Sequence, residues 1–183
     1  MKKSALVASI VLLMGVSSLA NSASTGTITF NGLITDNTCN VDVNGQGSDA
    51  IVTLPTVSAN QLVSSGNSAG RTTFYMNVSG CQIGNTFSRV AAYFQPGATV
   101  DLATGRLLNV GGTASLVDLQ LLDVTGNNSV INVGNTNQIT DMAFVDVDGT
   151  GSATLPYAVE YYANAQVTPG TVTSSVVYNL QYE

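Results

Sequence analysis

The sequence predicts an all-β domain, built as a sandwich or a barrel. Short runs rich in Val, Ile, Thr, Tyr and Phe follow one another along the chain, and clusters of Gly, Asn, Asp and Pro separate them. After the first 23 residues, no stretch keeps a helical period with caps over about 10–12 residues. Many short strands joined by glycine-rich turns are typical of sandwiches and barrels.

Eight segments are expected to be strands because they combine β-branched and aromatic residues and end at turn residues. They are residues 27–34, 51–54, 72–78, 90–94, 116–124, 142–147, 154–162 and 172–182. The turns between them include "NGQG", "SSGNSAG", "QPG", "TGNN", "DGTG" and "TPG". No linker, repeat or second-domain signal interrupts this pattern.

The first and last of these segments carry the clearest alternation. In residues 27–34, Ile28, Phe30 and Ile34 share one face with Gly32, and a glycine inside a strand suggests that another chain segment comes close there. The last segment has about 11 residues, against a usual strand length of about 5–6. One of its faces is largely apolar and carries Val176, Tyr178, Leu180 and Tyr182. Because chain ends fray unless they are paired, this strand requires a partner.

The N-terminus predicts export. Lys2 and Lys3 precede an apolar run over residues 5–13, and small residues follow. This order is that of a secretory signal peptide, and the run is shorter than the about 20 apolar residues of a membrane span. We therefore expect residues 1–23 to be a signal peptide, cleaved near residues 20–23. An uncleaved anchor is the alternative.

The net negative charge of the chain argues against anionic partners. Removal of the signal peptide would take away both lysines and leave three arginines against eleven acidic residues, a net charge of −8. Such a chain is not expected to bind nucleic acid or an anionic membrane through its general field.

Two cysteines, Cys39 and Cys81, predict one disulfide. An exported chain reaches an oxidising compartment where a disulfide persists. A metal site would need more ligands than two thiols, and the sequence has no histidine. No cofactor is expected.

Catalytic motifs are not apparent. The usual catalytic base, histidine, is absent, and no free cysteine is expected as a nucleophile. The carboxylates are scattered among polar loops. "DVDGTG", residues 146–151, superficially resembles a calcium loop but lacks its later acidic ligands, so a hairpin turn is the favoured interpretation. Two tripeptides beginning at Asn77 and Asn127 fit the glycosylation sequon, but so short a match assigns no function. We do not expect an enzyme.

Several motifs in order resemble one family. They are the signal peptide, the pattern formed by Phe30, Gly32 and Ile34 ahead of Cys39, and "FYMNVSGC" ending at Cys81. The middle, "GRLLNVGGTASLVDLQLLDVTGNNSVINVG", and the end, "LPYAVEYYANAQVTPGTVTSSVVYNLQYE", continue the likeness. The chain resembles the pilin subunits of the chaperone–usher pathway, close to the type 1-like fimbrial major subunits.

This resemblance implies an incomplete immunoglobulin-like β-sandwich that lacks its last strand. A periplasmic chaperone, and then the N-terminal extension of the next subunit, would lend the missing strand. The implied parts are a donor extension at residues 24–38 and a pilin domain at 39–183. The implied donor residues are Ile28, Phe30, Gly32 and Ile34. The implied acceptor groove and chaperone-binding strand contain Gly170, Val176, Tyr178, Leu180 and Tyr182.

The function implied is structural: a subunit of a fimbria that polymerises head to tail, supports cell adhesion and is exported through the periplasm and an outer-membrane usher to the bacterial surface. Identical or homologous pilin subunits are its partners in the polymer. The alternatives are a minor, adaptor or adhesive tip subunit, or a self-contained secreted carbohydrate-binding β-sandwich. A tip adhesin of this family carries an additional receptor-binding domain, for which 183 residues leave no room.

Overall fold

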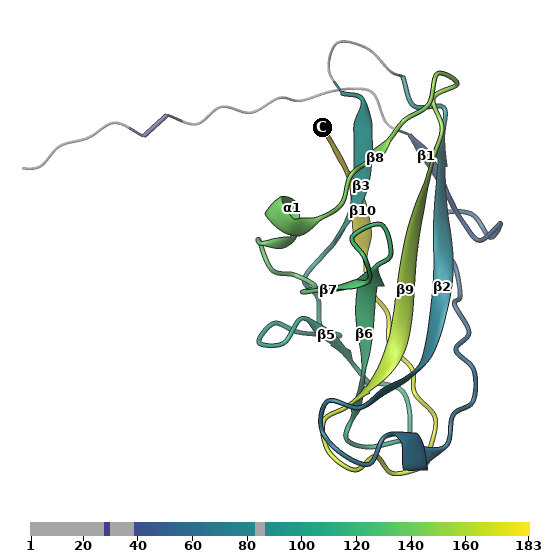
Figure 1. Ribbon diagram of the computed structural model, residues 1–183, viewed down its shortest axis with the longest axis vertical. Helices are drawn as coiled ribbons and strands as arrows, with labels where there is room; N and C mark the ends of the chain where they lie inside the picture. Colours follow the sequence, from purple (N-terminus) through teal and green to yellow (C-terminus); the bar gives the residue numbers. More distant parts are fainter. Residues whose placement is uncertain (1–27, 30–38, 83–86) are drawn as a thin grey trace, which may run out of the picture. The chain divides into compact units, whose positions relative to one another are not determined.

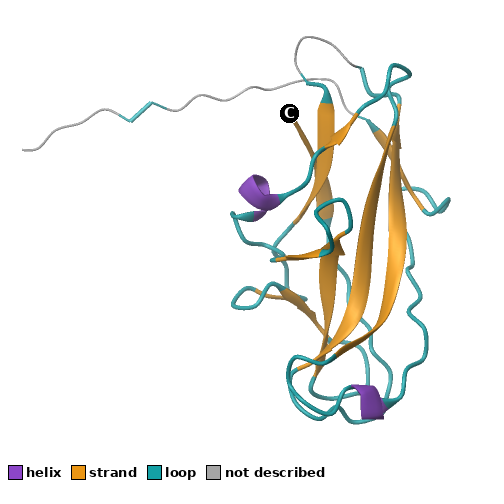
Figure 2. Cartoon of the chain, in the orientation of Figure 1, coloured by secondary structure: helices purple, strands orange, loops and turns teal. Residues whose placement is uncertain are grey.

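The computed structural model describes residues 28–29, 39–82 and 87–183. The chain divides into two units, Met1–Ile34 and Thr35–Glu183, and all regular secondary structure of the described residues lies in the second unit. The regular secondary structure of that unit is almost entirely strand, and loops join the strands (Figure 2). The predicted all-β class is confirmed.

The described residues form ten strands and two short helical turns (Figure 1). The strands are β1 Asn40–Val43, β2 Ser68–Ser79, β3 Arg89–Phe94, β4 Val100–Asp101, β5 Arg106–Leu108, β6 Val117–Asp123, β7 Ser129–Ile131, β8 Val145–Asp146, β9 Ala153–Ala163 and β10 Tyr178–Tyr182. The turns are a 3-10 helix, Ala59–Gln61, and α1, Gln138–Asp141.

These strands form two antiparallel sheets. The larger sheet has the order β1-β2-β9-β6-β5-β4, with β7 also paired to β6, and the smaller has the order β10-β3-β8. Figure 1 shows the long strands β2, β9 and β6 side by side. Thus β10 and β1, near the two ends of the described chain, are each an edge strand of a different sheet.

The core lies between the two sheets. Phe94 of β3 and Tyr157 of β9 meet edge to face, with ring centroids 5.1 Å apart, and Phe74 of β2 lies 6.0 Å from Tyr157. Met76, Val90 and Leu155 are almost completely buried around them. Each such side chain stabilises the fold by about 1.5–3 kcal/mol through the loss of apolar surface to water.

The longest strand pair, β2 with β9, contains an irregularity at Gly70. The register shifts between Ala69 and Thr72, and Gly70 has φ +69°. A Cβ atom at this glycine would lie 2.9 Å from the Tyr161 ring. Glycine therefore allows both the left-handed backbone and the close ring contact.

The larger sheet contains a buried carboxylate, Glu160, whose hydrogen bonds come from neighbouring side chains. Glu160 of β9 is 3% exposed and accepts hydrogen bonds from the Arg71 Nε at 2.8 Å and the Gln120 Nε2 at 3.2 Å. A carboxylate buried in this way needs a paired charge and hydrogen bonds, and it has both.

Several details of the sequence prediction were wrong. Residues 51–54 form no strand, and the predicted strand 172–182 is ladder-paired only from Tyr178. The short strands β1, β4, β5 and β7 were not predicted. Residues 142–147 form only the short β8, and its turn is not a hairpin, because β8 pairs with β3 while β9 belongs to the other sheet. Aspartate and glycine at 148 and 149 make the turn, but which strands it joins depends on tertiary packing.

Candidate functional site

One edge of β10 is paired with β3. The Arg89 N–H donates to the Glu183 carbonyl and the Glu183 N–H to the Arg89 carbonyl, both at 3.0 Å, and the Gln95 N–H donates to the Val177 carbonyl at 2.8 Å. Backbone groups of an antiparallel strand point alternately to its two sides. Odd-numbered residues of this segment therefore direct their backbone groups to β3.

The even-numbered residues direct their N–H and C=O groups to the opposite side. They are Tyr178, Leu180 and Tyr182. In the part of the chain that the structure describes, no hydrogen bond reaches the backbone groups of these three residues. The outer edge of β10 is therefore ready to pair with another strand.

A row of hollows follows this open edge. The first, of about 300 Å³, reaches the core residues Phe74, Met76 and Phe94 and is bordered by residues 174–176. The second, of about 720 Å³, lies along β10, and the third, of about 410 Å³, lies along residues 167–172. We call these three hollows together the groove. An apolar floor with an unpaired strand edge beside it suits an extended peptide.

The far wall of the groove comes from β1 and the residues that follow it. Val41 borders the second hollow, Val52 and Leu54 border the first, and Val57 borders the third. Sequence reasoning missed this wall as a site. The sequence feature that could have indicated this wall is the alternation of Val52 and Leu54, which was interpreted only as a strand of the sandwich.

Four predicted groove residues share the inner face of the C-terminal segment. Val176, Tyr178, Leu180 and Tyr182 are partly buried and pack against the core, whereas Val177 on the other face is 65% exposed. The side chains of these four residues thus lie over the apolar floor of the groove, while the outer backbone edge of β10 has no described partner.

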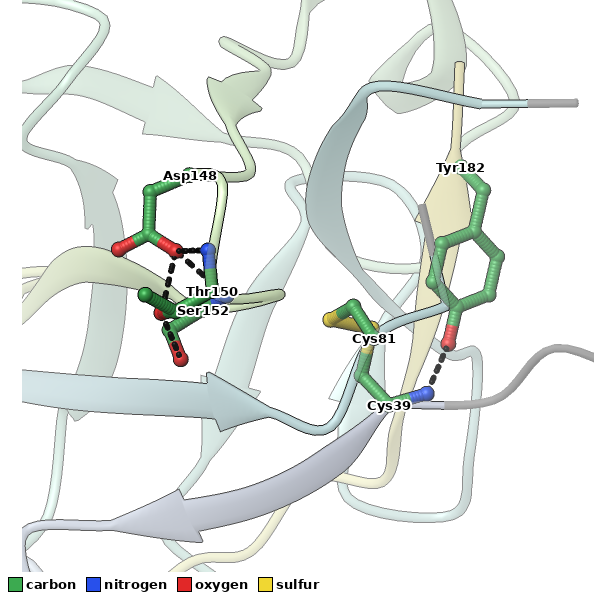
Figure 3. Close-up of a disulfide and its surroundings, with 6 residues drawn as sticks. All are labelled: Cys39, Cys81, Asp148, Thr150, Ser152 and Tyr182. Atoms are coloured by element: carbon green, nitrogen blue, oxygen red, sulfur yellow. Dashed lines mark hydrogen bonds between the residues drawn. A yellow bond between two sulfur atoms is a disulfide. The ribbon is translucent and has the colours of Figure 1, made fainter. Parts of the chain in front are cut away.

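Two tyrosines of β10 cross to the far wall. The Tyr178 hydroxyl donates to the Ser48 carbonyl at 2.8 Å, and burial raises the pKa of Tyr178, with the Asp49 charge adding to this. The Cys39 N–H donates to the Tyr182 hydroxyl at 3.2 Å (Figure 3). The Tyr182 ring also lies 4.7 Å from that of Phe87. These contacts fix the distance between the two walls at one end of the groove.

Gly170, the fifth predicted groove residue, borders the third hollow. A Cβ atom at Gly170 would collide with the backbone nitrogen of Ala114 and would lie 2.7 Å from the Thr113 carbonyl carbon. The glycine therefore lets the C-terminal segment approach residues 113–114 closely. This is a packing requirement of the chain's own fold.

Of the four predicted donor residues, only one lies among the described residues. Phe30, Gly32 and Ile34 lie outside the described residues. Ile28 is described, has no regular secondary structure and is 78% exposed.

A disulfide joins Cys39 and Cys81, with a Cα–Cα distance of 4.3 Å (Figure 3). It links the residue before β1 to the loop after β2, at the same end of the groove as Tyr182. The bond therefore fixes the far wall to the body of the larger sheet.

Replacing both cysteines by serine is expected to destabilise the folded chain by about 4 kcal/mol, because a closed loop of 42 residues would be released in the unfolded state. Urea unfolding of the double variant and the wild type, each with its groove filled, measures the difference. Chemical reduction of the wild type should give the same loss. A midpoint unchanged by both treatments would contradict a stabilising role for the disulfide.

The candidate calcium loop is a turn closed by its own hydrogen bonds. Asp148 accepts from the Thr150 N–H at 2.8 Å, the Thr150 hydroxyl at 2.6 Å and the Ser152 N–H at 3.0 Å (Figure 3). Among the described residues no group of three or more metal-type ligands occurs. One carboxylate oxygen of Asp148, Oδ1, accepts all three of these bonds within the turn.

The same bonds, the Thr150 hydroxyl first, lower the pKa of Asp148 from its ordinary value of 3.8. Because the folded pKa is the lower one, the contribution to stability is present above pH 3.8 and is lost as the pH falls through the folded pKa. Asp148→Asn is therefore expected to lower the melting temperature at pH 7 and to change it less at pH 2. Asp49→Asn, in another exposed loop, is the control. Equal shifts at both pH values would contradict the assignment.

The helical turns in the part of the chain that the structure describes lack the length and the apolar character of a membrane-spanning helix.

The fold and the groove together define a class: an immunoglobulin-like sandwich left open beside its C-terminal strand. Residues 54–183, well over half of the chain, match the family described as FimA, type-1 fimbrial protein A. The chain belongs to this family, whose members are subunits of chaperone–usher pili.

The sequence is similar to those of two fimbrial proteins over nearly its whole length. The chain is 46% identical to the major fimbrial subunit SMF-1 of Stenotrophomonas maltophilia, over 93% of this chain and 99% of that protein. It is 37% identical to the F17 fimbrial protein of Escherichia coli, over 94% and 95%. A solved subunit of a chaperone–usher pilus superposes with a TM-score of 0.57 at 20% identity, covering 87% of this chain and 96% of that one, which supports the fold. The predicted family and fold are confirmed, and the family is one of structural proteins.

Proposed function

We propose that this chain is a structural subunit of a surface fimbria and that its groove is filled by a strand from another molecule. The observation that carries the proposal is the free edge of β10, where no described residue pairs with the backbone groups of Tyr178, Leu180 and Tyr182 beside an opening to the core. A strand added there would form a hydrogen-bonded ladder and cover the apolar floor at the same time.

Two features of the groove walls support this proposal. Residues 51–54 and 172–177 have the sequence pattern of strands but no ladder on the groove side. The carbonyls of Thr173, Ser175 and Val177 are all used on the opposite side, toward Val110, Thr99 and Gln95. A strand between the two segments would give both the partner they lack.

The donor strand comes from the N-terminal extension of a neighbouring subunit. Its apolar residues Ile28, Phe30 and Ile34 alternate with polar ones, so one face can enter the groove while the backbone pairs with β10. Gly32, on the same face, occupies a narrow place. Because the extension of one subunit enters the groove of another, each contact joins two different parts of the chain, so it is head to tail and builds an open filament.

Before assembly, a periplasmic chaperone occupies the groove, and the subunit leaves it at an outer-membrane usher. The chaperone strand covers β10 and the exposed core, which prevents aggregation through that edge. Exchange for the neighbour's extension then places the subunit in the fimbria on the cell surface, where the fibre supports adhesion. The net charge of −8 expected after signal cleavage adds no affinity for nucleic acid.

Deletion of residues 24–34 tests this proposal, because the shortened chain keeps its groove and loses its donor strand. Produced with its chaperone and usher, it is expected to form no polymer by itself. Mixed with tagged full-length chain, it should occur at most once per fibre, at an end. Quantification of the shortened chain in purified fibres measures this.

The matched control is binding of a synthetic peptide with the sequence of residues 26–37, which the shortened chain should still accept as well as the full-length chain does. Incorporation of the shortened chain throughout the fibres would overturn the donor role of the extension.

A further inference from the structure

The smaller sheet has a second edge at which a strand could add. β3 pairs with β10 on one side, while on the other side β8 reaches only Arg89 and Val90. Beyond β8, the even-numbered residues of β3 direct their backbone groups to this second side by the same alternation that opens β10. These residues are Ala92 and Phe94.

Side chains form hydrogen bonds with the backbone groups of that second edge. The Tyr157 hydroxyl accepts from the Ala92 N–H at 2.9 Å. The Gln138 amide binds Phe94 twice: its Oε1 accepts from the Phe94 N–H at 3.1 Å and its Nε2 donates to the Phe94 carbonyl at 2.9 Å. A side-chain amide offers one donor and one acceptor, as a residue of a neighbouring strand would.

Both side chains are held for this contact. Gln138 is 6% exposed and begins α1, which lies beside β3 in Figure 1. Tyr157 is 3% exposed, and its burial raises its pKa to about 12, so the hydroxyl stays neutral. The Gly134 N–H adds a further bond to the Phe94 carbonyl at 3.1 Å.

Ala92 and Phe94 are buried, at 3% and 1% exposed, but packing does not fill the space beside them. A cavity of about 230 Å³ adjoins Ala92, Gln138 and Tyr157, with Ile131 and Asp123 among its other lining residues. There is space beside β3, but its hydrogen-bonding groups are already used. On β10 the situation is reversed, because the backbone groups of Tyr178, Leu180 and Tyr182 have no partner in the described part of the chain.

We infer that Gln138 and Tyr157 are specificity-determining residues for strand addition, which they direct to β10 by closing the second edge of the same sheet. The partner that they exclude is the extension of a further copy of this chain. The inference rests on the proposed function, since it concerns which edge the donor strand selects. Unpaired edges are the usual route to wrong association of β proteins, and a side chain that satisfies an edge removes that route.

The test measures how much labelled peptide of residues 26–37 assembled fibres take up, since their grooves are already filled. Gln138→Leu removes the amide and keeps a similar volume. The control is Gln120→Leu, which removes a buried amide bound to Glu160, away from β3. Fibres of Gln138→Leu are expected to bind up to one more peptide per subunit than fibres of Gln120→Leu, and to associate laterally.

Tyr157→Phe provides a second variant if Gln138→Leu does not assemble, because it removes only the hydroxyl at Ala92. It should also bind more peptide than the control, and hydrogen exchange of the Ala92 amide should become faster. The inference is overturned if fibres of the variant that assembles, Gln138→Leu or Tyr157→Phe, take up no more peptide than fibres of Gln120→Leu. Failure of the proposed function has a different signature: wild-type fibres would themselves take up one peptide per subunit, because their grooves would be empty.

Discussion

Without a strand in its groove, the mature chain is expected to aggregate or to be degraded when it is produced in the periplasm without a chaperone. The open edge of β10 and the apolar hollow that reaches Phe74, Met76 and Phe94 are then exposed together. Each apolar donor side chain buried in the groove contributes about 1.5–3 kcal/mol. Three such side chains, those of Ile28, Phe30 and Ile34, would contribute a large share of the stability of a domain, typically about 5–15 kcal/mol.

The same reasoning predicts a rescue. A copy of "GTITFNGLITDN", residues 26–37, joined after Glu183 by a flexible linker is expected to give a soluble monomer with a cooperative melt. Size-exclusion chromatography and thermal unfolding measure this. A copy with its residue order scrambled is the control and should not rescue. If the chain without any added strand is already a stable monomer, the incomplete-sandwich proposal is wrong.

Gly32→Leu is expected to abolish incorporation of the subunit as a donor while its chaperone complex stays folded and abundant. In a groove packed like a core, four additional side-chain carbons at the narrow position cost roughly 1–3 kcal/mol or more through overpacking. As an ordinary strand residue of its own domain, Gly32 would instead tolerate a small substitution such as Gly32→Ala, which restricts the unfolded chain.

Exchange in solution measures the effect of Gly32→Leu. The purified chaperone complex of the variant is mixed with the wild-type complex, and dimers and longer polymers are followed by native electrophoresis. Thr29→Leu, a substitution on the opposite face of the same segment, is the matched control and should polymerise. Normal polymerisation by Gly32→Leu would remove the donor role, and loss of its chaperone complex would place the glycine in the subunit's own core.

The sequence by itself determined the all-β class, because period-two alternation and turn residues are local properties of the chain. It also marked the inner face of the last segment, since Val176, Tyr178, Leu180 and Tyr182 alternate with polar residues. The pairing of Cys39 with Cys81 followed from their number and the expected compartment, and the structure contains this bond.

Other features were decided by tertiary structure. Residues 51–54 have the composition of a strand, but a strand needs a neighbour, and β1 rather than this segment pairs with β2. The turn at Asp148 was evident from its aspartate and glycine, yet its role as a crossing between the two sheets depends on which strands lie beside β8 and β9.

The edge contacts of β3 had no signal in the sequence at all. Gln138 lies 44 residues from Phe94, and Tyr157 lies 65 residues from Ala92. A glutamine in a short helix and a tyrosine in a strand have many ordinary roles, and no local pattern distinguishes one that satisfies a distant backbone. Only the folded chain brings these groups within 3.1 Å of the edge they close, because hydrogen bonds between distant segments are fixed by packing and not by periodicity.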